Sequence, residues 1–144
     1  MGPGTMMDKL YLALGSNLGD RESYIRQAVR LLDVKLGRDH EAITPLMQTE
    51  AIGFDGGDFL NCIVVYRSDL SPKRILGICK EVEKELGRTD APEYDASGKR
   101  VYHDRTIDVD ILMYGSRKVE TEDLVIPHPQ VESRPYIKKL LLFL

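Results

Sequence analysis

Residues 59–67 read FLNCIVVYR, a run of β-branched and aromatic residues that predicts a buried β-strand. Ser71 and Pro72 then open a predicted helix, because serine caps helix N-termini and proline suits the first helical turn. Apolar residues follow at helical spacing and stop before Gly87; they are Ile75, Ile78, Cys79, Val82 and Leu86. The centre of the chain is therefore predicted to be a strand followed by an amphipathic helix.

The residues before this strand predict a similar sequence of elements. Residues 9–14 (KLYLAL) form an apolar run typical of a buried strand, and 15–20 (GSNLGD) are turn residues. A helix is predicted from an Asp20 N-cap to a stop at Gly37. A weaker strand is expected over 42–49, where Pro45 favours an edge position or a bulge. A loop rich in glycine and aspartate covers residues 53–58.

The residues after the central helix complete the pattern. Residues 88–104 are polar, contain Gly and Pro and lack periodicity, and structureless loops of this length are usually functional lids or disordered. Residues 106–114 return to a strand, and a short helix is expected from Pro135. This order predicts an α+β fold of the ferredoxin-like βαββαβ type, an antiparallel sheet with helices packed on one face.

Length and composition limit the class of protein. The chain has 144 residues, 20 Lys+Arg and 23 Asp+Glu, for a formal net charge of -3. That is enough for one domain and gives no basic surplus for general nucleic-acid binding. No apolar run approaches the ~20 residues of a membrane span. We expect one domain over residues 8–144, with residues 1–7 a vector-derived or disordered start and a short or truncated C-terminus. Cys62 and Cys79 are expected to be buried free thiols, which favours a cytoplasmic location.

Residues 104–112 (DRTIDVDIL) carry the most informative pattern. Strand side chains alternate between faces, so Asp108 and Asp110 share one face while Ile107, Val109 and Ile111 point into the core. The Cα atoms of the two aspartates would lie roughly 6.6 Å apart by strand rise. Such a pair is typical of a solvated strand face, or of a site where Mg²⁺ bridges carboxylates and substrate phosphates.

Basic groups gather around the long loop. The candidate phosphate-binding residues are Arg88, Lys99, Arg100, Arg105, His128 and Arg134. Each one taken singly is also explained as a solvated surface charge. A cation-bearing loop that closes over a polyphosphate would exclude water and complete a site. The 15–19 turn (GSNLG) lacks the spacing and the lysine of a P-loop, so that mode of ATP binding is excluded.

Asn61 is an amide within an apolar strand, two residues after Phe59. A buried amide needs hydrogen-bond partners, which the backbone could supply. The alternative is that Asn61 reads the edge of a flat heterocycle while Phe59 stacks on its face.

Together these segments resemble the 6-hydroxymethyl-7,8-dihydropterin pyrophosphokinases of folate biosynthesis. The resemblance extends over nearly the whole chain from about Lys9, and its most specific element is the Arg-x-x-Asp-x-Asp strand. The matching segments are 13–20 (ALGSNLGD), 59–61 (FLN), 83–88 (EKELGR), 104–112 (DRTIDVDIL), 126–129 (IPHP) and Arg134. Tyr102 stands where many members have Trp, Asp104 where many have Pro, and Ala51 where Pro is common.

The resemblance implies a Mg²⁺-dependent enzyme that transfers pyrophosphate from ATP to the hydroxymethyl group of the pterin and releases AMP. Asp108 and Asp110 would hold two Mg²⁺ ions, and Arg88 and Arg105 would complete the catalytic set. ATP would contact Glu83, Arg88, Arg105, Ile111, His128 and Arg134. The pterin would contact Gly15, Thr49, Ile52, Phe59, Asn61, Tyr102 and Tyr136.

Two other functions stay open at this point. One is a ferredoxin-like RNA-binding or regulatory module, which the net charge and the absence of aromatic-basic runs disfavour. The other is a different metal-dependent phosphotransferase that uses the same aspartates. With the pyrophosphokinase hypothesis we expect a monomer whose partners are ATP and the pterin, without nucleic acid or membrane.

Overall fold

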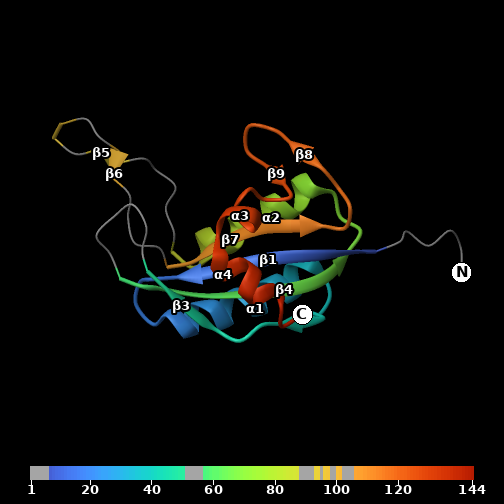
Figure 1. The fold of residues 1–144 in the computed structure, drawn as a ribbon, viewed down its shortest axis with the longest axis horizontal. Helices are drawn as coiled ribbons and strands as arrows, with labels where there is room; N and C mark the ends of the chain where they lie inside the picture. Colours follow the sequence, from blue (N-terminus) through green and yellow to red (C-terminus); the bar gives the residue numbers. More distant parts are fainter. Residues whose placement is uncertain (1–6, 51–56, 88–92, 95, 98–99, 102–105) are drawn as a thin grey trace, which may run out of the picture.

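The computed structural model describes residues 7–50, 57–87, 93–94, 96–97, 100–101 and 106–144. Its centre is a five-stranded antiparallel sheet, shown in Figure 1. The strands are β1 (Asp8–Ser16), β2 (Ala42–Ile43), β3 (Met47–Thr49), β4 (Phe59–Ser68) and β7 (Asp108–Tyr114). The order is β2-β4-β1-β7, and β3 also pairs with β4. This is the strand order of the predicted ferredoxin-like βαββαβ fold, which is confirmed.

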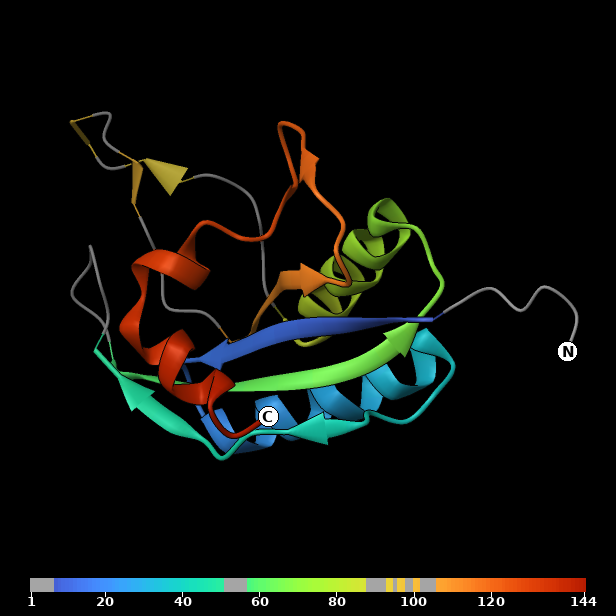
Figure 2. The ribbon, with the colours of Figure 1, turned by 45° about the vertical axis from the view of Figure 1, so that its right-hand side comes forward.

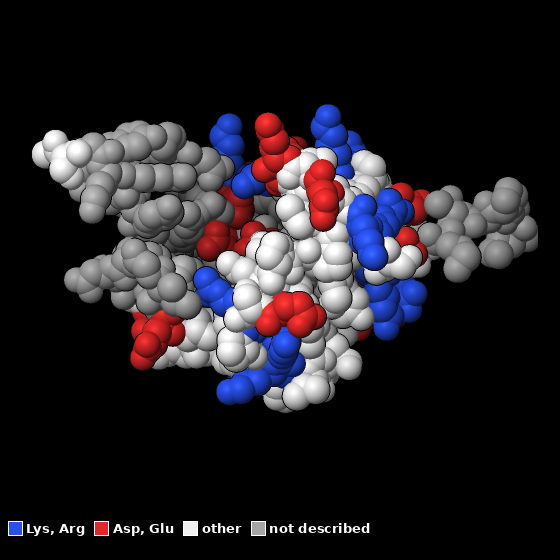
Figure 3. Space-filling view, turned by 45° about the horizontal axis from the view of Figure 1, so that its top comes forward, with Lys and Arg blue, Asp and Glu red and all other residues white. Residues whose placement is uncertain are grey.

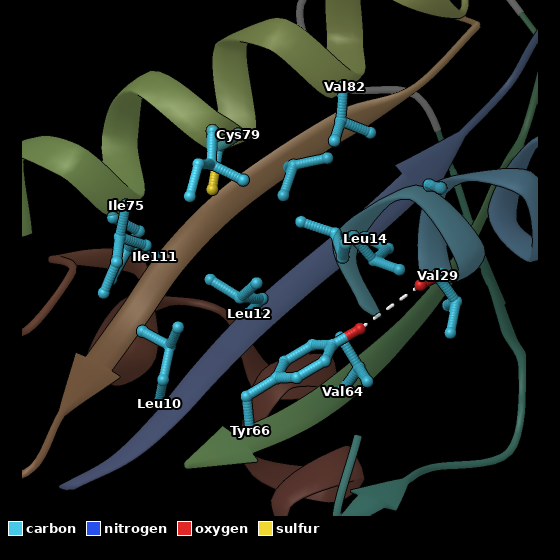
Figure 4. Close-up of a cluster of buried hydrophobic side chains, with 14 of the residues drawn as sticks. Leu10, Leu12, Leu14, Val29, Val64, Tyr66, Ile75, Cys79, Val82 and Ile111 are labelled. Atoms are coloured by element: carbon cyan, nitrogen blue, oxygen red, sulfur yellow. Dashed lines mark hydrogen bonds between the residues drawn. The ribbon is translucent and has the colours of Figure 1, made fainter. Parts of the chain in front are cut away.

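Two helices cover one face of the sheet: α1 (Arg21–Leu36) and α2 (Pro72–Glu85). The side chains of Leu10, Leu12 and Leu14 alternate along β1 and pack against the apolar faces of these helices, as Figure 4 shows. Tyr66 of β4 lies in the same cluster and donates a hydrogen bond to the carbonyl of Val29, 3.4 Å away. This cluster is the main hydrophobic core of the described chain.

The helix ends follow the predicted capping residues. The Asp20 side chain accepts a hydrogen bond from the Ser23 N–H at 3.1 Å, and the Ser71 hydroxyl accepts one from the Arg74 N–H at 3.2 Å. Gly37 ends α1 in the left-handed conformation with φ 76°, which glycine adopts without a Cβ penalty. The predicted starts of both helices and the stop of α1 are confirmed.

The opposite face of the sheet carries a second, smaller core under the C-terminal segment. Here lie α3 (Gln130–Ser133) and α4 (Pro135–Leu141), in front of the sheet in Figure 2. Ile137 and Leu140 of α4 pack on Ile63 of β4 and Leu112 of β7. The predicted helix from Pro135 is confirmed, and α4 is the element that covers this second face.

Several boundaries differ from the predictions. β1 runs through Gly15 and Ser16, predicted to be turn residues, because both pair with β4. The strand expected over 42–49 is divided into β2 and β3 around Thr44, Pro45 and Leu46. The segment between β2 and β3 still contacts the sheet, because the Thr44 hydroxyl accepts a hydrogen bond from the Ile63 N–H at 2.9 Å.

Four short strands were not predicted. β5 (Glu93–Tyr94) pairs with β6 (Arg100–Val101) inside the stretch expected to lack secondary structure, to one side of the main sheet in Figure 1. β8 (Val119–Glu120) pairs with β9 (Val125–Ile126), whose last residue begins the IPHP segment. Two-residue strands are too brief to produce a recognisable alternation of polar and apolar residues.

The cysteines and the surface agree with the composition. Cys62 and Cys79 are buried free thiols, as predicted, and burial raises the pKa of Cys62 to about 12. On the described part of the face in Figure 3, basic and acidic side chains are interspersed. Within the described ranges, the structure contains no helix of sufficient length and apolar character to span a membrane.

Candidate active site

The two aspartates lie on β7 as the alternation predicts. Val109 and Ile111 are buried toward α2, whereas Asp110 is exposed and Asp108 is half-buried on the opposite face. Leu112 continues the aspartate face and packs beneath α4. One strand face therefore carries two carboxylates at its start and an apolar anchor at its end.

The chemistry of this pair fits Mg²⁺. Carboxylate oxygens are hard ligands, and Mg²⁺ is usually held by one or two of them together with waters and substrate phosphates. In the part of the chain that the structure describes, no group of three or more His, Cys, Asp or Glu side chains is arranged to hold a metal ion. Asp108 and Asp110 can thus contribute part of a coordination shell, which water and phosphate oxygens would complete.

Four of the predicted pterin-binding residues lie together at the same end of the sheet. Gly15 of β1 pairs with Asn61 on one side and with Asp108 on the other. Thr49 of β3 pairs with Phe59 of β4. A Cβ atom at Gly15 would lie 3.1 Å from Asn61 Oδ1 and 3.5 Å from a Phe59 ring carbon. This end of the sheet therefore brings an amide, an aromatic ring and a hydroxyl next to the first aspartate.

The Asn61 amide is fixed by its neighbours. Asn61 is 6% exposed, and its Nδ2 donates to the Thr49 hydroxyl at 2.8 Å and to the Met47 carbonyl at 3.2 Å. Because a carbonyl only accepts hydrogen bonds, these contacts identify which end of the amide is nitrogen. Both contacts use Nδ2, and Oδ1 lies on the Gly15 side. The backbone contact expected for a buried amide is therefore compatible with a hydrogen bond that Oδ1 accepts from the edge of a flat heterocycle.

Tyr136 of α4 lies on the same face as the aspartates. Burial raises the pKa of its hydroxyl, the nearby Arg134 lowers it, and the negative charges of Asp110 and Asp108 raise it again. The Arg134 guanidinium lies 5.8 Å from the centre of the Tyr136 ring. The influence of both carboxylates on Tyr136 indicates that α4 brings this aromatic ring near the aspartate pair.

A cavity of about 330 Å³ opens on the other side of Asp110. Three predicted site residues, Asp110, Ile111 and His128, line it. The other lining residues are Leu76, Lys80, Val109, Glu122, Asp123, Leu124, Val125 and Pro129. Val109 is on β7 and Pro129 follows β9, whereas the other residues come from α2 and the β8–β9 hairpin. The sequence patterns gave no sign of the role of α2 and the hairpin, because these elements meet β7 only through long-range packing.

His128 at the rim of the cavity is held in one orientation. Its backbone N–H donates to the Leu112 carbonyl at 2.8 Å, and its Nδ1 accepts from the Gln130 N–H at 3.1 Å. An accepting Nδ1 in a neutral imidazole assigns the ring proton to Nε2. The geometry therefore presents an N–H donor of His128, which suits an anionic oxygen.

Glu83 is buried behind this cavity. Its side chain is 2% exposed, and Oε2 accepts a hydrogen bond from the Val109 N–H at 2.9 Å. The remaining predicted site residues, Ile52, Arg88, Tyr102 and Arg105, lie outside the described residues, as does the candidate Lys99. Arg100 begins β6, and its side chain is not described.

Comparison with known proteins identifies the family. The model of the 7,8-dihydro-6-hydroxymethylpterin-pyrophosphokinase (HPPK) family matches residues 11–144. The chain belongs to this family. It is similar to the 2-amino-4-hydroxy-6-hydroxymethyldihydropteridine pyrophosphokinase of Porphyromonas gingivalis, with 42% identity over 131 residues, covering 90% of this chain and 85% of the relative. The resemblance inferred from the sequence is confirmed.

Two further HPPK relatives carry the same name. That of Bacillus subtilis is 37% identical over 128 residues, covering 88% of this chain and 72% of the relative. That of Aquifex aeolicus is 37% identical over 137 residues, covering 94% of this chain and 79% of the relative. As an HPPK family member, the chain is a pyrophosphokinase of folate biosynthesis that transfers pyrophosphate from ATP to 6-hydroxymethyl-7,8-dihydropterin.

Proposed function

We propose that the pyrophosphoryl transfer takes place at the end of the sheet where β1, β4 and β7 meet, and that it depends on Mg²⁺. The observation that carries this proposal is the position of Asp108 and Asp110 between two groups of residues. The Gly15–Asn61 group lies on one side, and the 330 Å³ cavity opens on the other. A donor and an acceptor bound in these places would meet at the carboxylates.

Asp108 and Asp110 would hold two Mg²⁺ ions through their carboxylate oxygens. When bound, the ions neutralise the charge of the triphosphate and align it for in-line attack, which releases AMP. Arg88 and Arg105 complete the proposed catalytic set as cations that contact the phosphates. Cations near developing phosphate charge contribute strongly in a site from which water is excluded.

The nucleotide would occupy the cavity beside Asp110. Its proposed direct contacts are Arg88, Arg105, Ile111, His128 and Arg134, while Glu83, also predicted to bind ATP, lies behind the cavity wall and would act through Val109. Support comes from the apolar wall at Ile111, the Nε2–H of His128 and the Arg134 guanidinium near Tyr136. An apolar wall with a few oriented polar groups is the usual character of a small-molecule site.

The pterin would bind against the Gly15 end of the sheet. Its proposed contacts are Gly15, Thr49, Ile52, Phe59, Asn61, Tyr102 and Tyr136. Phe59 and Tyr136 offer aromatic faces for a flat heterocycle, and aromatic pairs favour stacked arrangements. A Cβ at Gly15 would lie 3.1 Å from Asn61 Oδ1 and 3.5 Å from a Phe59 ring carbon, so the glycine allows these two side chains to pack close to β1.

We further propose that the enzyme works as a cytoplasmic monomer on these two small substrates, without nucleic acid or membrane. The interspersed charges on the described part of the face in Figure 3, together with the net charge of -3, argue against a nucleic-acid partner. Size-exclusion chromatography with light scattering would test the monomer.

The decisive experiment mixes the protein with ATP, Mg²⁺ and 6-hydroxymethyl-7,8-dihydropterin and separates AMP from ADP. We expect AMP as the nucleotide product and no turnover after chelation of the metal. Asp108→Asn and Asp110→Asn should each lower kcat by more than about a hundredfold while the fold is kept, because each removes a metal ligand. Asp69→Asn, on the exposed loop beyond the far end of β4, is the matched control and should behave as wild type. Formation of ADP, or full activity in either site variant, would refute the proposal.

A further inference from the structure

Glu83 is a carboxylate in the apolar stripe of α2. It follows Cys79 by one helical turn, next to Val82, and is 2% exposed. A buried carboxylate is costly unless hydrogen bonds and a counter-charge compensate its lost hydration. Its position therefore demands specific partners, which identify what the residue supports.

The first partner is the backbone between the two aspartates. Glu83 Oε2 accepts from the Val109 N–H at 2.9 Å. In the described sheet β7 pairs with β1 on one side only, and alternate N–H groups of such a strand point away from its neighbour. Glu83 receives one of these outward N–H groups, so α2 is fixed to β7 at the residue that separates Asp108 from Asp110.

The second partner is a residue of the cavity wall. Glu83 Oε1 lies 3.7 Å from Lys80 Nζ, one turn earlier on α2. Lys80 and Val109 both line the cavity beside Asp110, and Glu83 is not among the described residues that line it. From behind the cavity wall, Glu83 thus contacts two residues that line the cavity, Val109 through a hydrogen bond and Lys80 through an ion pair.

We infer that Glu83 is a positioning residue, which sets the geometry of the Asp108–Asp110 pair and the adjoining cavity through its hydrogen bond to Val109. This inference rests on the proposed function and deepens it, because it identifies Glu83 of α2 as the residue that positions the proposed nucleotide-binding part of the site. The hydrogen bond fixes the strand between the metal-binding carboxylates, and supports of this kind typically change metal affinity by about 10–100-fold when removed.

Two conservative variants separate the effect of the hydrogen bond to Val109 from the effect of the negative charge of Glu83. Glu83→Gln keeps an oxygen at the same distance and loses the charge, so Val109 retains its acceptor. Glu83→Asp keeps the charge and is shorter by one methylene, so the 2.9 Å contact is lost. Glu81→Gln and Glu81→Asp are the matched controls, since Glu81 is an exposed residue of the same helix that pairs with Lys35.

The first measurement uses the protein without ligands. Amide hydrogen exchange at Val109 should become faster in Glu83→Asp and stay near the wild-type rate in Glu83→Gln and in both Glu81 variants. The second measurement is calorimetric titration with a Mg²⁺-loaded, non-hydrolysable ATP analogue. Its Kd should rise about tenfold in Glu83→Asp and less than threefold in Glu83→Gln, while the KM for the pterin stays unchanged.

Other results overturn the inference. Wild-type exchange and nucleotide affinity in Glu83→Asp would show that the contact does not position the strand. A loss in Glu83→Gln together with wild-type behaviour in Glu83→Asp would mean that the charge of Glu83, and not its hydrogen bond to Val109, is what matters. An equal rise in the pterin KM would mean a general loss of structure. These outcomes are distinct from failure of the proposed function, in which the wild-type protein itself would release no AMP.

Discussion

Gly15 is the residue on which the two halves of the site depend most closely. It pairs with Asn61 on β4 and with Asp108 on β7, and therefore lies between the amide of the proposed pterin site and the first carboxylate. A side chain at this position would meet Asn61 Oδ1 at 3.1 Å, which is closer than ordinary van der Waals contact. The absence of a Cβ is thus a condition for the arrangement of this end of the sheet.

Replacing Gly15 by alanine should weaken pterin binding. The new Cβ displaces the Asn61 side chain and strains its hydrogen bonds to Thr49 and Met47. Overpacking of this kind costs about 1–3 kcal/mol, and 1.4 kcal/mol corresponds to a tenfold change in affinity. We expect the KM for the pterin to rise about tenfold and the KM for ATP to stay within about twofold, measured by steady-state titration of each substrate. A larger effect on ATP than on the pterin would contradict this assignment.

At the scale of elements, α2 combines two roles. Ile75, Ile78 and Val82 bury one face of the helix in the main core, and Glu83 reaches β7 from the same face. Its exposed face includes Gly77, where a Cβ would meet nothing within 4 Å. Because glycine in a helix interior gives up more backbone entropy than alanine, this exposed position is suboptimal for stability.

Gly77→Ala should therefore stabilise the protein without affecting catalysis. The expected gain in the free energy of unfolding is about 0.5–1 kcal/mol, the usual difference between the two residues inside a helix. Urea unfolding measures the gain, and kcat together with both KM values should match wild type. The variant is also the glycine-to-alanine control for Gly15→Ala. Destabilisation, or a change in kcat, would show that Gly77 has a contact or role beyond its place in the helix.

The elements also show where prediction from the sequence succeeds. The caps at Asp20 and Ser71 were predictable because capping is local chemistry within one helical turn. The end of β1 was not predictable, because Gly15 and Ser16 have the composition of a turn and are held in the strand by pairing with β4. The alternation of Asp108 and Asp110 followed from strand geometry. The cavity could not be predicted from the sequence, because Lys80 and the β8–β9 hairpin meet β7 only in the folded chain.

On the scale of the whole molecule, the main hydrophobic core and the two aspartates lie on opposite faces of the sheet. The face under α1 and α2 holds the main core, and the opposite face carries the two aspartates at one end and the smaller core under α4 at the other. The titratable side chains of the main core include Cys62, Tyr66 and Cys79. Burial raises the pKa of both thiols, that of Cys62 to about 12, and burial followed by the hydrogen bond to Asp33 raises the pKa of Tyr66.

Stability should therefore fall at alkaline pH. The folded protein keeps thiol protons that the unfolded chain releases above about pH 8.5, so ionisation favours the unfolded state as pH rises. Each cysteine contributes up to about 1.4 kcal/mol of lost stability per pH unit, and Tyr66 adds to the loss above about pH 10. Urea unfolding between pH 7 and 10 should show a plateau and then a decline, and Cys62→Ala should lower the slope while Gly77→Ala leaves it unchanged. A free energy of unfolding that stays constant up to pH 10 would contradict the prediction.

The fixed orientation of the Asn61 amide has a consequence for substrate selection. Its two N–H bonds are directed to Thr49 and Met47, so the atom left to meet a ligand at the proposed pterin site is the acceptor Oδ1. A heterocycle that binds there gains only if its edge presents a hydrogen, as the lactam form of a pterin does with its ring N–H. The lactim form, in which that nitrogen is a lone pair, would face Oδ1 with acceptor against acceptor. The sheet would thus discriminate between tautomers of one molecule through the direction of a single side-chain amide.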